Sequence, residues 1–455
     1  MGKTEIILQF LNARSGIYFL SSEEGDTRNI RDFAVQAGSF LGDPSFERMG
    51  FPDWPTLFHA LVHHRNFPRH TEAGKVVIAI DEFPYLITRN RAIPSVFQKI
   101  WDEILSRESV VLILSGSSVS TMETEVLGAA SPLFGRRTGQ WQVEPLFYPF
   151  LRQFFPYPEE ELATIWFVLG GIPAYLLRFQ PDATFWENVR DQILTKGTYL
   201  YAEAELLLNY EFREAGNYMA IFRAIAGGCT TVARICMETG FDKSMVSKYL
   251  SVLSRLHIIW EEIPVTAHMG FRRRQYRIAD PYLTFWFRYV HPSRIDLEAG
   301  RTDEVILRIQ ETFSTYCGPM FELLCDNLTR HHLLFPDFTF SALGRWWQGE
   351  EEIDLVGLSD DTKEGLFCEC TWRDLSYREA RTLLARLEKK ADQVRWEQDR
   401  RTERFALIGR SIEGKDDLAR EGYLPYNLED ISRLSRAYLQ EKEVASIQPV
   451  RHSHR

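Results

Sequence analysis

Apolar residues in the first third of the chain fall into short runs that helical patterns separate. The runs predict four strands, at Gly16–Leu20, Val76–Ile80, Val110–Leu114 and around Trp141–Pro145. Between them, apolar residues spaced three and four apart predict amphipathic helices, for example over Thr4–Leu11 and Pro94–Leu105. Strands that alternate with helices in this way indicate an α/β fold with a parallel sheet.

The pattern changes further along the chain. Helical segments follow residue 148, and between 218 and 291 three helices precede two short strands, the order of a winged helix-turn-helix. A mixed pattern begins near residue 305, with a hairpin of 352–357 and 365–370 before a charged helix at 377–396. The predicted domains are an α/β domain at 1–147, a helical connector at 148–215, a winged helix at 216–291, an α+β domain at 303–440 and a tail at 441–455.

Composition narrows the class of protein. Hydrophobic side chains make up 45% of the 455 residues and charged ones 25%, which is typical of globular domains and excludes disordered chains. The formal charge of −10 argues against nucleic acid bound over the whole surface, although residues 216–291 carry ten Lys and Arg against five Asp and Glu. The six cysteines lack metal-ligand spacing, and no signal peptide or membrane-spanning run is found. We therefore expect a cytoplasmic protein that does not enter a membrane.

The first helix opens with Gly2, Lys3 and Thr4, the back end of the phosphate-binding loop GxxxxGK[ST]. In such a loop the backbone N–H groups hold phosphates, the Lys contacts the β and γ phosphates, and the Thr hydroxyl binds Mg²⁺. Three residues alone also fit an accidental match, so the interpretation depends on its context.

The context is the strand at 76–80, which ends in Asp81 and Glu82. The first carboxylate is placed to hold the Mg²⁺ that Thr4 also ligates, and the second to polarise the water that attacks the γ phosphate. Ser115 ends the next strand, where a hydroxyl can stand between these acids and the nucleotide. Acids and serines of ordinary turns have the same appearance.

A basic loop follows at Gly135–Gly139. Its adjacent arginines, Arg136 and Arg137, suit an exposed loop that meets a phosphate or the nucleotide of a neighbouring subunit. A plain pair of surface arginines is an equal alternative, and action in trans requires an oligomer.

Together these segments resemble the archaeal-type P-loop ATPases that are related to the AAA and STAND classes and carry a C-terminal domain of unknown function. The resemblance covers nearly the whole chain, and its carriers are Asp81–Tyr85, Leu114–Ser118, Ser131–Gly139 and Gly171–Pro173. It implies that Lys3, Thr4, Asp81 and Glu82 serve ATP and Mg²⁺, that Arg136 is an arginine finger, and that the turn with Gly171 and Pro173 lies near the adenine.

The front of the chain departs from this family. Members have a first strand and the leading glycine of the loop, both of which are absent before Met1. Because that strand is central in the P-loop sheet, its absence is expected to leave neighbouring strands with unpaired backbone groups. We hypothesise a shortened start or a degenerate copy.

The winged helix is the second candidate site. Its recognition helix, at 242–256, turns Lys243, Ser247 and Lys248 outward, a face that suits phosphates and base edges. Between the wing strands lie Arg272, Arg273 and Arg274, where they can contact a DNA backbone. The alternative is a winged helix that serves only structure or protein contacts.

The third candidate site is C-terminal. Asp354 and Glu369 are expected to meet across the hairpin and, with Glu322 on a preceding helix, resemble the Mg²⁺-binding acids of the PD-(D/E)xK restriction-endonuclease-like fold. That pattern places a Lys two residues after the second acid, where this chain has Thr371. A hydroxyl supplies no positive charge, so we predict a metal-binding remnant without nuclease activity, unless Arg373 or another cation substitutes.

The sequence therefore predicts an ATP-binding, ATP-hydrolysing switch that couples its nucleotide state to a winged helix and a nuclease-like domain. Its expected ligands are ATP, Mg²⁺ and double-stranded DNA. The alternative is a DNA-binding or regulatory protein whose ATPase half is degenerate.

Overall fold

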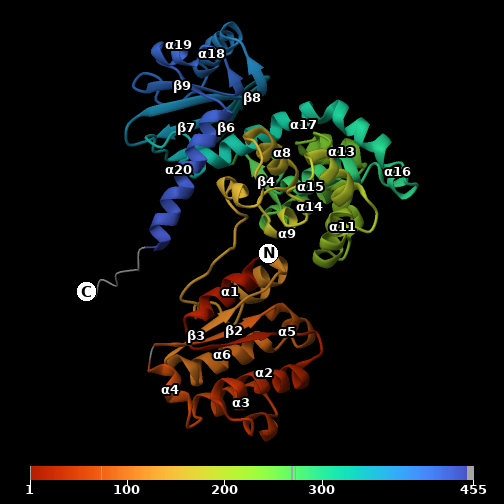
Figure 1. Ribbon diagram of the computed structural model, residues 1–455, viewed down its shortest axis with the longest axis vertical. Coiled ribbons are helices and arrows are strands. Elements are labelled where there is room, and N and C mark those ends of the chain that lie inside the picture. Colours follow the sequence, from red (N-terminus) through yellow and green to blue (C-terminus); the bar gives the residue numbers. More distant parts are fainter. Residues whose placement is uncertain (1, 73, 268–269, 272, 448–455) are drawn as a thin grey trace. The chain divides into compact units, whose positions relative to one another are not determined.

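The computed structural model describes residues 2–72, 74–267, 270–271 and 273–447. The chain divides into two compact units, Met1–Glu144 and Pro145–Arg455 (Figure 1). Arg272, one of the three arginines expected on the wing, lies outside the described residues.

The first unit is built on a parallel sheet with the strand order β1-β2-β3. Its strands are β1 (Gly16–Leu20), β2 (Val76–Asp81) and β3 (Val110–Leu114). Its helices are α1 (Lys3–Asn12), α2 (Asp26–Leu41), α3 (Trp54–Val62), α4 (Phe67–Thr71), α5 (Phe83–Arg89), α6 (Ile93–Glu103) and α7 (Val119–Thr121). The α/β fold with a parallel sheet is confirmed.

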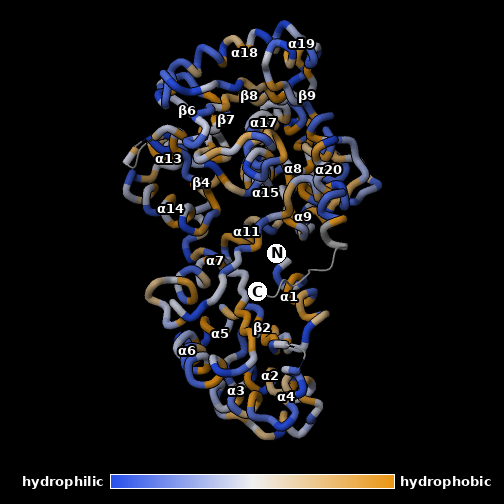
Figure 2. Tube along the Cα trace, turned by 90° about the vertical axis from the view of Figure 1, so that its left-hand side faces the viewer, coloured by the Kyte–Doolittle hydropathy of each residue, from blue (hydrophilic) through white to orange (hydrophobic). Residues whose placement is uncertain are grey.

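Strand β2 is the centre of this sheet. All six of its residues are buried, and it hydrogen-bonds to β1 on one side and β3 on the other. A strand covered on both faces takes apolar residues at every position, which explains the unbroken run seen as a hydrophobic stretch in Figure 2. Both of its neighbours are parallel, so the carboxyl ends of the three strands share one edge of the sheet.

The fourth predicted strand does not form. Residues 141–145 have no strand partner within the described part of the chain, and Trp141 is 92% exposed. In this sheet β3 pairs only with β2 among the described residues, and its residues after Val110 are half-buried. A strand needs a neighbour for its backbone groups, and residues 141–145 do not pair with β3 in the described structure.

The second unit begins with helices. They are α8 (Glu159–Leu169), α9 (Pro173–Leu176), α10 (Phe185–Asn188) and α11 (Tyr199–Glu211). Three helices and an antiparallel hairpin follow: α12 (Ala215–Ala226), α13 (Val232–Thr239), α14 (Lys243–Arg255), β4 (Ile259–Glu262) and β5 (Gln275–Ile278). Then come α15 (Pro281–Phe285), α16 (Arg294–Glu298) and the long α17 (Thr302–Arg330).

A mixed sheet with the order β10-β9-β8-β7-β6 closes the chain. The strands β6 (Ala342–Gln348), β7 (Glu351–Ser359) and β8 (Glu364–Leu375) are antiparallel, and β9 (Thr402–Ile412) and β10 (Leu424–Tyr426) continue in parallel. The helices α18 (Tyr377–Ala391), α19 (Lys415–Arg420) and α20 (Leu428–Ile447) accompany them. The predicted hairpin is confirmed as β7 and β8. No helix of the described residues has the length and apolarity needed to cross a membrane.

Candidate functional site

The start of α1 and the end of β2 meet at Asp81. The Thr4 hydroxyl donates a hydrogen bond to Asp81 Oδ2 at 2.6 Å, and the Tyr18 hydroxyl donates to the same oxygen at 3.0 Å. The other oxygen, Oδ1, accepts the backbone N–H of Glu82 at 3.1 Å. Asp81 is 1% exposed, so neutral donors from three elements fix a buried carboxylate. The structure thus brings together the half loop and the strand-end acid, 77 residues apart.

The phosphate-loop residues occupy the start of α1. Gly2 has φ of +96°, a left-handed conformation that favours glycine, and Lys3 is the first residue of the helix. Backbone N–H groups at this helix start have no partner one turn earlier, which makes them suitable for an anion.

Glu82 stands beside Asp81 in a left-handed conformation with φ of +53°. The Ser21 hydroxyl supports this bend by donating to the carbonyl oxygens of Asp81, at 2.8 Å, and Glu82, at 2.6 Å. The Glu82 carboxylate accepts the N–H of Ser117 at 3.1 Å and its hydroxyl at 2.7 Å. The second acid is therefore turned away from Asp81 and held by the loop after β3.

Of the serines that follow β3, Ser117 contacts Glu82, and the nucleotide contact expected of Ser115 stays a prediction. The Ser115 N–H donates to Ile80 and its carbonyl accepts from Phe83, which fixes the strand ends. Its own hydroxyl is buried without a partner in the described structure. Ser117, two residues later, is the serine that contacts Glu82.

The residues around Asp81 fit a magnesium ion. A hydroxyl and a carboxylate that already lie 2.6 Å apart are oxygen ligands of the kind that Mg²⁺ takes beside a nucleotide. Sequence reasoning missed Tyr18, although its polar tip in a buried strand next to β2 was a signal. Burial and the hydrogen bond to Asp81 raise the pKa of Tyr18 to about 12, so its hydroxyl keeps its proton and stays a donor.

Arg136 is engaged within its own unit. Its Nε lies 3.0 Å from both carboxylate oxygens of Asp102 on α6, and Nη1 donates to the carbonyl oxygens of Pro132 and Phe134. An arginine-finger role requires that the guanidinium exchange Asp102 for a phosphate.

The turn at Gly171 has a packing explanation. The Gly171 carbonyl accepts the N–H of Leu146 at 2.7 Å, and an added Cβ would lie 2.1 Å from the Leu146 carbonyl oxygen. Pro173 starts α9. That this turn contacts an adenine stays a prediction.

Helix α14 presents the polar face that its sequence predicts. Val246, Leu250 and Leu253 are buried in the core. Asp242 caps the helix by accepting the N–H groups of Ser244 and Met245. The outward residues are all exposed: Lys243, Ser244, Ser247, Lys248 and Ser251.

The hairpin β4–β5 is less open than expected. Arg273 and Arg274 are exposed, but Arg274 forms an ion pair with Glu261 on the neighbouring strand. Arg274 is therefore not a free cation in this conformation, because a hairpin brings oppositely charged residues of its two strands together.

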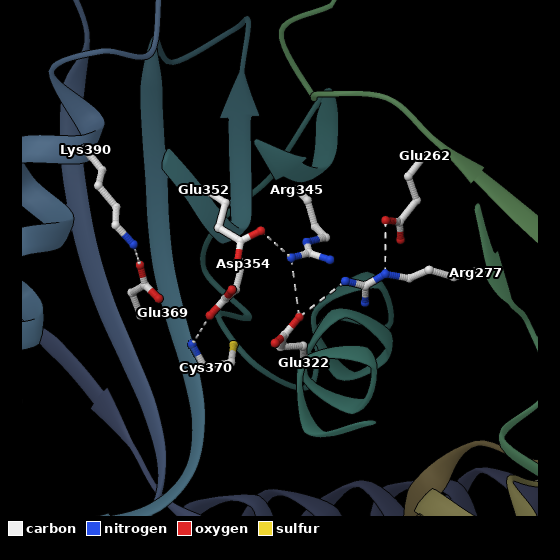
Figure 3. A network of polar contacts seen from close by, with 9 residues as sticks. All are labelled: Glu262, Arg277, Glu322, Arg345, Glu352, Asp354, Glu369, Cys370 and Lys390. Carbon is white, nitrogen blue, oxygen red and sulfur yellow. Dashed lines mark hydrogen bonds and ion pairs between the residues drawn. The ribbon is translucent and has the colours of Figure 1, made fainter. Parts of the chain in front are cut away.

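In the C-terminal sheet, Asp354 and Glu369 meet across β7 and β8 as predicted. Asp354 Oδ2 accepts the N–H of Cys370 at 2.9 Å. Burial and the charge of Asp354 raise the pKa of Glu369 to about 8. Burial also raises the pKa of Asp354 and, together with that residue's charge, the pKa of Glu322 on α17. These acids are held in a poorly solvated region (Figure 3).

The motif has no cation at Thr371, but a lysine from helix α18 lies next to Glu369. Lys390 on α18 forms an ion pair with Glu369, and both side chains are largely buried, with 23% and 17% exposed. Arg373, the substitute considered from sequence, instead pairs with Glu379 on the surface. Lys390 follows the buried stripe of α18, beside Leu387 and Ala391, which was the available signal.

The three acids are not assembled as a metal site. No group of three or more His, Cys, Asp or Glu side chains capable of holding a metal ion occurs in the part of the chain that the structure describes. Glu322 lies instead 3.5 Å from Arg277 and 3.6 Å from Arg345. The expected remnant of Glu322, Asp354 and Glu369 therefore does not fit a bound metal in this arrangement.

Comparison with known proteins shows the family to which the chain belongs. A model of an ATPase domain found predominantly in Archaea matches residues 1–179, and a family described as "Archaea bacterial proteins of unknown function" matches residues 286–383. An uncharacterised protein of Methanocaldococcus jannaschii is 33% identical over 437 residues, 95% of this chain and 93% of that protein. The chain belongs to this archaeal ATPase family. The resemblance inferred from the motifs is thereby confirmed.

Further similarities to archaeal proteins are more limited. A second uncharacterised protein of Methanocaldococcus jannaschii is 61% identical over 44 residues, 10% of this chain and 43% of that protein. The Walker-type ATPase of Pyrococcus abyssi has a TM-score of 0.41 and 22% identity over 63% of this chain and 88% of that one. The ORC1 protein of Aeropyrum pernix in complex with DNA has a TM-score of 0.30 and 15% identity, over 66% and 85%. Family membership rests on the sequence matches.

Proposed function

We propose that this chain is an ATP-binding and ATP-hydrolysing switch, which couples its nucleotide state to a winged helix and a nuclease-like domain. The observation that carries the proposal is the 2.6 Å hydrogen bond from Thr4 to Asp81, which joins the end of a phosphate loop to a strand-end acid. Membership of an archaeal ATPase family supports the same activity.

Each residue near Asp81 has a role in this chemistry. Lys3 and the N–H groups at the start of α1 bind the β and γ phosphates. Thr4 and Asp81 hold Mg²⁺, which offsets the negative charge of the phosphates when bound. Glu82 orients the attacking water, and its carboxylate turns from Ser117 to do so. Arg136 completes the set as an arginine finger once a phosphate replaces Asp102 as its partner.

The segment of α12–α14 with the β4–β5 hairpin is proposed to be a winged helix that contacts duplex DNA. The support is the exposed face of α14, where Lys243 and Lys248 can neutralise phosphates and Ser247 can donate a hydrogen bond. Arg273, which is exposed between β4 and β5, can add a further phosphate contact. Such binding weakens steeply with salt, since phosphate contacts release counterions.

The C-terminal sheet is proposed to have the PD-(D/E)xK-like fold without its cleavage activity. A helix, three antiparallel strands, a helix and a parallel strand are the supporting order, in α17, β6–β8, α18 and β9. Against cleavage stands the neutralisation of Glu369 by Lys390 and of Glu322 by arginines.

A calorimetric titration of Mg-ATP into the full chain tests the proposal. We expect saturable binding that Lys3→Ala abolishes, because the ammonium contacts the phosphates. Lys99→Ala is the matched control, since Lys99 makes only a surface pair with Glu103. If the wild-type chain shows no heat of binding, the second candidate stands, a DNA-binding or regulatory protein with a degenerate ATPase.

A further inference from the structure

The β4–β5 hairpin is tied to the C-terminal sheet by a chain of charged side chains (Figure 3). Arg277 on β5 lies with Nε 3.2 Å from Glu262 and with Nη2 3.5 Å from Glu322 on α17. The same Glu322 oxygen is 3.6 Å from Arg345 on β6, and Arg345 lies 3.1 Å from Glu352 on β7. The guanidinium of Arg277 on β5 is therefore shared between Glu262 on the neighbouring strand β4 and Glu322 on α17.

A backbone contact accompanies this ion-pair chain. The N–H of Val265, three residues after β4, donates to the carbonyl oxygen of Arg345 at 2.9 Å. The Val265 side chain packs against the apolar cluster of the C-terminal sheet. The segment that follows β4 within the hairpin is thus docked on β6, and the hairpin does not project freely from its three helices.

The charged groups at this junction are poorly solvated. The side chains of Arg277 and Glu322 are each 20% exposed, and that of Arg345 is 13% exposed. Burial raises the pKa of both Glu262 and Glu322. A carboxylate in such a place is stabilised only while a cation stays next to it, and a phosphate that drew Arg277 away would have to compensate for that loss.

We propose that the contact between Arg277 and Glu322 is a latch that holds the hairpin against the C-terminal domain, and that a DNA duplex competes with Glu322 for Arg277. The proposal rests on the DNA contact proposed above and adds its regulation. A polyanion offers phosphates to the same guanidinium, so Glu322 lowers the affinity of the winged helix for DNA while the latch is closed.

The substitution Glu322→Gln tests the latch in the full chain, with Glu352→Gln as its matched control. Both replace a carboxyl group of the same junction by an amide, but Glu352 contacts Arg345 and not Arg277. We expect Glu322→Gln to bind a fluorescein-labelled duplex about tenfold more tightly, within the usual range for coupled sites. The slope of log affinity against log salt should steepen by about one, because one more arginine reaches a phosphate. Glu352→Gln should bind like the wild type.

The outcomes separate the latch from the DNA contact. An equal gain in both variants means that only net charge matters and overturns the latch, as does wild-type affinity in Glu322→Gln. Absence of binding by all three proteins overturns the DNA contact and the latch with it. The added substitution Arg277→Gln must cancel the gain of Glu322→Gln. If Glu322→Gln does not fold, Glu322→Asp withdraws the carboxylate by one methylene, and a folded protein without any gain overturns the latch.

Discussion

The carboxylates of Asp81 and Glu369 both stand on buried strands, but the two regions satisfy them with opposite chemistry. Asp81 is bound by neutral donors, the hydroxyls of Thr4 and Tyr18 and one backbone N–H. Glu369 is paired with the ammonium of Lys390. Glu322, close to it in the sheet domain, is paired with arginines.

The hydrogen-bond donors described for Asp81 are neutral, whereas the partner of Glu369 is a protein cation. Neutral donors orient a carboxylate and leave its charge available to a metal ion, whereas an ammonium or guanidinium cancels that charge. The comparison therefore supports our proposal of phosphate chemistry in the first unit and of a structural role for Glu369 and Glu322 in the second. Four experiments test this comparison.

The largest effect is expected from Glu82→Gln. Loss of the base that orients water should lower the rate of ATP hydrolysis by about 10²–10⁴-fold while Mg-ATP still binds. Steady-state turnover and calorimetry on the same protein measure both quantities. Glu103→Gln, on the surface of α6, serves as the control and should hydrolyse ATP at the wild-type rate. Undiminished turnover in Glu82→Gln would contradict the role in ATP hydrolysis proposed for the acids of the first unit.

The next effect is on stability. Lys390→Met leaves the Glu369 carboxyl without its hydrogen-bond donor in a region of low solvation and should lower the free energy of unfolding by about 2 kcal/mol, the cost of an unsatisfied buried polar group. Urea denaturation measures this change. Arg373→Met removes an exposed pair with Glu379 and should change stability by less than about 0.5 kcal/mol. Equal losses in the two variants would contradict the structural role of Lys390.

The third experiment concerns pH. Burial beside Asp354 raises the pKa of Glu369 from 4.5 to about 8. The native state therefore keeps a proton that the unfolded chain has lost, and this contribution to stability is complete below the unfolded pKa and vanishes as the pH rises through about 8. In Glu369→Gln, stability should fall less between about pH 5 and pH 9 than in the wild type. If the melting temperatures of the two proteins change equally with pH across this range, the raised pKa of Glu369 is refuted.

No effect at all is expected in a plasmid-nicking assay with Mg²⁺ or Mn²⁺. Glu369 and Glu322 have protein cations as partners, so the wild type and Asp354→Ala should both leave the plasmid intact. Turnover that disappears in Asp354→Ala would overturn the non-cleaving proposal and make Lys390 the substitute for the lysine missing at residue 371.

Much of the fold followed from local pattern. The unbroken apolar run of β2 can form only a strand covered on both faces, and the spacing of Val246, Leu250 and Leu253 fixes the inner face of α14. The prediction at 141–145 was wrong because a strand depends on a neighbour as well as on its own sequence.

Candidate sites were predictable where a motif carries the chemistry. The type and order of residues 2–4 and of the pair at 81–82 predict a phosphate-binding and a metal-binding role. Ser117 lies within the stretch Leu114–Ser118 that the motifs singled out, whereas Tyr18 was missed because it belongs to another strand and follows no fixed spacing. Lys390 was missed for the same reason, since it reaches Glu369 from a helix 21 residues later.

The sequence by itself determined the kinds of element, the acids and the half loop, because periodicity and motif order are local properties of the chain. Whether each acid lies next to a charged or a neutral partner depends on the tertiary structure. An ammonium near Glu369 or a hydroxyl near Asp81 depends on packing between distant elements, and it is this environment that makes one carboxylate suitable for a metal ion and the other a neutralised part of the core.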